Sequence, residues 1–160
     1  MDKFSRRIYH NPGQFWEDFR FLMKNRSRIR AVMKQNLIPP AFRERLMMAV
    51  TTVNGCRYCS YLHAREALLA GVPETEVEAL LSGVVDHCPK EEAAAIFYAQ
   101  HWAESDANPD PDARQKLVEV YGSDIATAIE LVLRMIRVGN LMGNTWDYFL
   151  YRISFGRWGL

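Results

Sequence analysis

The sequence lacks any apolar run long enough to cross a membrane, and it carries almost no net charge. No segment approaches the ~20 consecutive apolar residues that a spanning helix needs, and the first ten residues, MDKFSRRIYH, lack the apolar centre of a signal peptide. Twenty basic residues against nineteen acidic ones give a formal charge of +1, which offers no overall field for nucleic acid or an anionic membrane. We therefore expect a soluble, cytoplasmic protein with neither nucleic acid nor membrane among its partners.

Cysteine is also scarce. Three cysteines in 160 residues are odd in number and too few for the disulfide scaffold of a secreted protein. In a reducing compartment, a C-x-x-C pair is typical of catalysis or metal binding rather than of structural cross-linking. Cys88 is left over, and we interpret it as a small buried hydrophobic residue.

The sequence shows no period-two alternation of a β-sheet, no internal repeat and no low-complexity segment. Apolar residues recur at helical spacing instead, with Asn11–Pro12 opening an early helix and a short helix predicted over residues 112–121. We predict an all-α fold, with a helical arm at residues 1–36 and a single-domain helical bundle at residues 37–160.

The longest predicted helix opens at Ser123 and runs to about residue 151. Its apolar residues cover more of the circumference than one core contact requires, which indicates a central helix or an oligomer interface. Gly139 and Gly143 lower helix propensity there, so they predict the close approach of another helix. Asn140 and Asn144, with Asp147, make a polar row on the same helix, and we expect most of this row to face solvent.

Residues 54–63, NGCRYCSYLH, place two thiols and an imidazole within ten positions. If Asn54 caps the following helix, Cys56, Cys59 and His63 share one face, because they are spaced three and four apart. A thiolate is the working nucleophile, and both a helix N-terminus and a nearby base favour it. Cys56 gains more from the helix dipole and Cys59 gains more from His63, so the residues alone leave open which sulfur attacks.

Glu44 lies in a predicted apolar helix over residues 40–53, and methionines occupy the positions three and four residues after it. No basic partner on the same helix therefore explains its carboxylate as an ordinary surface ion pair. The carboxylate must face water, find a tertiary partner or take part in chemistry.

Three interpretations of the cysteine pair remain open. The pair could be buried packing residues, or it could bind zinc with His63 and a fourth ligand from His87 or Cys88. A redox dithiol fits the spacing best, because one sulfur can attack an oxidised substrate and the other, one turn away, can resolve it as a disulfide. That chemistry needs no bound metal or cofactor.

Glu44 on one helix, followed by C-x-x-C-x-x-x-H at the start of the next, resembles the alkylhydroperoxidase D-like branch of the carboxymuconolactone decarboxylase family. The likeness extends over about residues 37–148. It implies an all-helical subunit that forms obligate homo-oligomers, commonly trimers or multiples of them. It also implies that Cys59 is the peroxidatic thiol, that His63 and Glu44 relay its proton, and that Cys56 resolves the sulfenate as a disulfide.

The resemblance implies a hydroperoxide or another oxidised small molecule as substrate, and a disulfide-reducing partner protein or thiol. One position departs from the pattern: the well-studied peroxidase form has a second histidine two residues after the first cysteine, where this chain has Tyr58. A phenol is a poor proton carrier at neutral pH, although it can orient a hydrogen bond. The departure leaves thiol–disulfide chemistry as the better-supported prediction and makes a peroxide the less favoured choice of substrate. The decarboxylase branch works without a cysteine pair, so the pair argues against decarboxylation.

Overall fold

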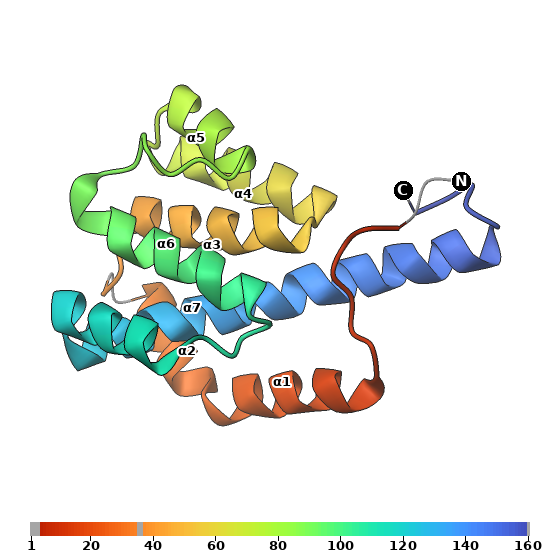
Figure 1. The fold of residues 1–160 in the computed structure, drawn as a ribbon, viewed down its shortest axis with the longest axis horizontal. Coiled ribbons are helices and arrows are strands. Elements are labelled where there is room, and N and C mark those ends of the chain that lie inside the picture. Colours follow the sequence, from red (N-terminus) through yellow and green to blue (C-terminus); the bar gives the residue numbers. More distant parts are fainter. Residues whose placement is uncertain (1–3, 35–36, 160) are drawn as a thin grey trace.

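The computed structural model describes residues 4–34 and 37–159, and these residues form seven helices and no strand (Figure 1). The prediction of an all-α chain is therefore confirmed for the described residues. The helices are α1 (Pro12–Lys24), α2 (Arg26–Lys34), α3 (Pro40–Asn54), α4 (Arg57–Leu69), α5 (Glu74–Leu81), α6 (Lys90–Glu104) and α7 (Pro111–Ile153).

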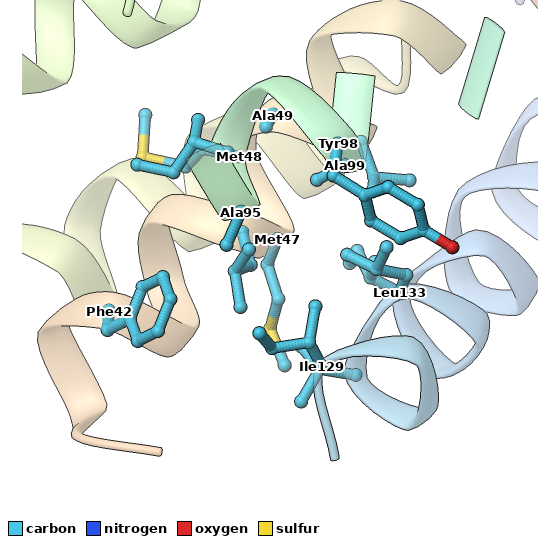
Figure 2. Close-up of a cluster of buried hydrophobic side chains, with 14 of the residues drawn as sticks. Phe42, Met47, Met48, Ala49, Ala95, Tyr98, Ala99, Ile129 and Leu133 are labelled. Atoms are coloured by element: carbon cyan, nitrogen blue, oxygen red, sulfur yellow. The ribbon is translucent and has the colours of Figure 1, made fainter. Parts of the chain in front are cut away.

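Helix α3 is the centre of the bundle. Ten of its fifteen residues are buried, and it contacts α4, α5, α6 and α7 (Figure 1). Figure 2 shows Met47 of α3, Ala95 of α6 and Ile129 of α7 meeting in the apolar core. Because α3 is enclosed on several sides, a polar side chain on it must find a partner inside the protein.

Helix α7 contains the break that the sequence predicts. Gly122 has φ 78 and ψ 161, so the helical residues before and after it are two runs, and a positive φ of this kind favours glycine. The second run continues past the bundle and lies beside the N-terminal segment (Figure 1). No helix of residues 4–34 and 37–159, α7 included, combines the length and apolar character needed to cross a bilayer.

The corner between α3 and α4 differs from the expectation. Asn54 does not cap α4: it is the last residue of α3, and Gly55 follows in the left-handed conformation with φ 73. Cys56 is the residue that caps α4, because its Sγ accepts a hydrogen bond from the backbone N–H of Cys59 at 3.3 Å. The physical reason is that glycine in this conformation ends a helix, so the Asn-Gly pair closes α3 instead of opening α4.

Helix α1 is held on α7 by a buried ion cluster. The Asp18 side chain is 4% exposed and pairs with Arg134 at 2.8 Å and with Arg137 at 3.1 Å. The Tyr9 hydroxyl donates a third hydrogen bond to Asp18, at 3.0 Å. Burial, reinforced by the charge of Asp18, raises the pKa of Tyr9, so its hydroxyl remains a donor. The predicted boundary between arm and bundle falls beside residues 35–36, which lie outside the described residues, and it stays a prediction.

Asp18→Ala should lower the free energy of unfolding by about 3 kcal/mol, because removing one partner of a buried ion pair leaves the other charge uncompensated. Urea unfolding measures the change. Asp110→Ala is the matched control, since Asp110 is 78% exposed in its contact with His101, and it should cost less than about 1 kcal/mol. Equal losses in the two variants would contradict the role assigned to Asp18.

Candidate active site

The tertiary partner of Glu44 is His63. Glu44 lies on α3 and His63 on α4, and the imidazole Nδ1 is 2.8 Å from the carboxylate Oε2. Their side chains are 9% and 14% exposed, and Arg43 adds a cationic contact at 3.7 Å from the other carboxylate oxygen. A carboxylate accepts hydrogen bonds, so we assign the Nδ1 proton to the imidazole, which leaves Nε2 as an acceptor. The imidazole is therefore oriented as a base.

Cys56 and Cys59 are joined by a disulfide. Both residues are buried, Cys56 at 2% exposure and Cys59 at 8%. Cys59 lies in the first turn of α4, and His63 follows it by one turn on the same face. The structure thus joins the Glu44 carboxylate of α3 to the imidazole of α4, and the spacing along α4 puts that imidazole one turn from Cys59.

Gly143 of α7 lies against the disulfide. A Cβ added to Gly143 would lie 3.6 Å from the Cys56 Sγ, so the predicted close approach is found there, with the α3–α4 corner as the neighbour. A Cβ added to Gly139 would meet no described atom within 4 Å. The expectation of a close approach at Gly139 is therefore wrong within the described chain.

A network of buried amides beneath the corner was missed from sequence. Asn54 donates to Asn140 at 3.1 Å, and Asn140 donates to Thr51 at 3.1 Å. Asn144 donates to the Asn54 carbonyl at 2.8 Å. Asn140 and Asn144 are 0% and 1% exposed, so the expectation that they face solvent is wrong.

The physical reason is that α3 and the N-terminal segment enclose the polar side of α7. The last carbonyls of a helix need partners outside it, and Asn144 supplies one to α3. Asp147 is partly buried and pairs with Arg6. The available signal for a buried amide network was a pair of asparagines four residues apart, on one helix face, beside the apolar residues Val138, Leu141 and Met142.

Tyr58 is not brought together with the other predicted site residues. It is 74% exposed, and its hydroxyl makes no hydrogen bond within residues 4–34 and 37–159. Tyr61, one turn along α4, is similarly exposed at 72%. The position that carries a histidine in the peroxidase form therefore lies on the outer face of α4.

The zinc arrangement is not formed in the described part of the chain, where no group of three or more His, Cys, Asp or Glu side chains is placed to hold a metal ion. His87 is exposed, and Cys88 lies beside Glu76 and Arg45. Cys88 is free and buried, as interpreted from sequence. Burial, followed by the negative charge of Glu76, raises the pKa of the Cys88 thiol to about 12.

These features define a class: a chain that is helical throughout its described elements, with a cysteine pair at the start of one helix and a Glu–His hydrogen bond between that helix and the one before it. The chain belongs to the carboxymuconolactone decarboxylase family, whose model matches residues 19–101. The match begins in α1 and ends in α6, so it includes Glu44, the cysteine pair and His63. Comparison with curated proteins and with solved structures gives no match.

Thiol counting should separate the three cysteines. The folded, oxidised chain should show no reactive thiol, because Cys56 and Cys59 are bonded and the Cys88 thiol is protonated and buried. Unfolding without reductant should expose one thiol and unfolding with reductant three, measured with a chromogenic disulfide reagent. Cys88→Ala is the control and should lower both unfolded counts by one. Three thiols without reductant would contradict the disulfide.

Proposed function

We propose that this protein is a thiol–disulfide oxidoreductase that reduces a hydroperoxide or another oxidised small molecule. The observation that carries the proposal is the Glu44–His63 hydrogen bond, which orients a base one helical turn from Cys59. The family includes decarboxylase and peroxidase-like members, and the cysteine pair supports thiol chemistry over decarboxylation.

The first step uses Cys59 as the attacking thiolate. The N-terminus of α4 stabilises its negative charge, and His63 takes its proton while Glu44 stabilises the resulting imidazolium. With a hydroperoxide, Cys59 Sγ attacks the terminal oxygen and the O–O bond breaks. Cys59 becomes a sulfenic acid, and the leaving alkoxide takes the proton from His63 and departs as an alcohol. The proposal assigns no proton transfer to Tyr58, because its side chain is exposed.

The second step forms the disulfide. Cys56 gives up its proton and attacks the Cys59 sulfur as a thiolate, the S–O bond breaks, and the hydroxide takes up one proton, equivalent to the one that Cys56 lost, and leaves as water. The product is the Cys56–Cys59 disulfide seen in the structure. An external dithiol protein, or two small thiols, then returns two electrons and two protons and becomes a disulfide itself. A reducing cytoplasm would keep this reductant available.

Reduced protein treated with one equivalent of hydroperoxide should lose two thiols, form the Cys56–Cys59 disulfide and release one equivalent of alcohol. Peptide mapping and thiol titration measure the first two changes, and chromatography measures the third. If the Cys56–Cys59 disulfide forms with low-molecular-weight disulfides but not with hydroperoxides, the activity is limited to thiol–disulfide exchange. Failure with every oxidant would contradict redox chemistry and leave a non-catalytic packing role for the pair.

Variants of the same protein should separate the roles in this reaction. Cys59→Ser should abolish oxidant reduction, whereas Cys56→Ser should stop at a sulfenic acid that dimedone traps. Glu44→Gln should slow the attack on the order of 100-fold, because general acid–base assistance contributes at least that much. Glu78→Gln is the matched control, since Glu78 is exposed on α5. Equal, small effects of both cysteine substitutions would contradict the assignment.

We also propose that the chain assembles as a homo-oligomer, a trimer or a multiple of it, through the second run of α7. An open apolar groove of about 670 Å³ lies between the N-terminal segment and this run, and its lining includes Tyr9 and Phe15. Met142, Trp146 and Phe149 line it from α7 and are 50%, 61% and 49% exposed. Contiguous exposed apolar surface of this kind marks interaction sites on soluble proteins.

Sedimentation equilibrium should therefore give a native mass of three times the 18.5 kDa of one chain, or a multiple of that. Trp146→Glu should shift the distribution toward smaller species, because a carboxylate in an apolar interface is costly to bury. Val120→Glu is the control: Val120 is 60% exposed but lies on the first run of α7. A monomeric wild-type chain would contradict the assembly.

A further inference from the structure

The N-terminal segment Phe4–Tyr9, here called the strap, lies over the α3–α4 corner and along α7 (Figure 1). The Arg7 N–H donates to the Asn54 carbonyl at 3.2 Å. The Asn144 side-chain amide donates at 2.8 Å to both the Arg7 carbonyl and the Asn54 carbonyl. The Phe4 ring packs edge-on against Tyr148, with ring centroids 5.2 Å apart. The strap is thus attached at the same point where α3 ends.

Arg6 of the strap and its partner Asp147 contact the residues on either side of Cys56. A Cβ added to Gly55 would lie 3.3 Å from the Arg6 side chain, so Arg6 covers the corner glycine. The Arg6 guanidinium pairs with Asp147 of α7, and the same carboxylate oxygen is 3.7 Å from the Arg57 guanidinium. Arg6 is 12% exposed in this contact, whereas Arg57 is 60% exposed. The Arg6–Asp147 pair therefore reaches both neighbours of Cys56 along the chain.

The contacts of Arg6 and Asp147 fall unequally on the surroundings of the two cysteines. Cys56 lies between Gly55 and Arg57, with Gly143 of α7 against its sulfur, and it is 2% exposed. Cys59 is 8% exposed. Among the contacts of the described chain, Arg6 and Arg7 touch neither cysteine, but Arg6 and Asp147 contact both chain neighbours of Cys56 and neither chain neighbour of Cys59. Loosening the strap should consequently expose Cys56 far more than Cys59.

We propose that the Arg6–Asp147 ion pair clamps the α3–α4 corner, keeps the Cys56 sulfur inaccessible to external reagents and so directs the reductant to Cys59. Arg6 is a positioning residue in this scheme, and the redox consequence rests on the proposed function.

In the exchange, a reductant thiolate attacks Cys59 Sγ, the Cys56–Cys59 bond breaks, and Cys56 leaves as a thiolate. The backbone N–H of Cys59, which already points at the Cys56 Sγ, and the positive end of α4 stabilise this leaving group. A second reductant thiolate then attacks the mixed disulfide, which frees Cys59 as a thiolate and leaves the reductant oxidised to a disulfide.

The test measures the access of each sulfur separately. In a Cys88→Ala background, Cys59→Ser leaves Cys56 as the single cysteine, and Cys56→Ser leaves Cys59. Adding Arg6→Ala should raise the alkylation rate of Cys56 by iodoacetamide at least tenfold and change that of Cys59 less than twofold. The rate is taken from the high-pH plateau of each profile, where the thiol is fully ionised and the rate reports access. At neutral pH, by contrast, the loss of the Arg6 cation disfavours the thiolate and so lowers the alkylation rate, which would mask the gain in access.

Two further variants keep the outcome interpretable. Arg114→Ala removes an exposed ion pair elsewhere and should change neither rate, while Arg6→Asp combined with Asp147→Arg should restore the slow alkylation of Cys56. If Arg6→Ala does not fold by circular dichroism, Asp147→Asn takes its place. Equal acceleration at both cysteines, or none at Cys56, would overturn the clamp.

A second experiment, on the oxidised wild-type chain with Cys88 present, tests which of the two sulfurs the reductant attacks. Brief exposure to glutathione, acid quenching and peptide mapping should place the mixed disulfide on Cys59, and Arg6→Ala should move part of it to Cys56. Glutathione mainly on Cys56 of the wild-type chain would overturn the assignment. Neither measurement requires peroxide reduction, so a failure of the proposed function and a failure of the clamp give different results.

Discussion

The carbonyl of Asn54 at the end of α3 is the point on which the rest of the site depends. It has no partner within its own helix, and the amide of Asn144 and the N–H of Arg7 satisfy it from α7 and from the strap. These two bonds hold the chain where it turns from α3 into α4. The direction in which the chain leaves this turn places His63 within hydrogen-bond distance of Glu44 and the Cys56 sulfur against Gly143.

Buried charges join α1, α5 and α6 to this frame. Arg45 of α3 pairs with Glu76 of α5 and Glu92 of α6, and Asp18 of α1 pairs with two arginines of α7. Unpaired charges in the interior are costly, so each cluster restricts its helices to one arrangement. The cysteine pair lies at the start of α4, where its disulfide closes across three residues of the chain.

The two sulfurs occupy different surroundings although they are three residues apart. Cys56 is covered by α7 and flanked by residues that Arg6 and Asp147 contact. Cys59 is the slightly more exposed residue of the two and the one nearer to His63 in sequence. This asymmetry gives a physical basis for separate attacking and resolving roles in the proposed chemistry. It also gives the N-terminal segment, which lies outside the matched family region, a part in the site.

The sequence by itself determined the helical class, the break before residue 123 and the spacing of Cys56, Cys59 and His63, because the repeat of one helix relates residues that are near in the chain. It also marked Glu44 as needing a partner, since no local one exists. The family resemblance pointed to His63 as that partner, and the tertiary structure supplies the hydrogen bond between them. Tertiary structure alone decided that Asn144 is buried and that Arg6 reaches Asp147. Those contacts join positions as far as 141 residues apart, and no local periodicity encodes which distant segments come together.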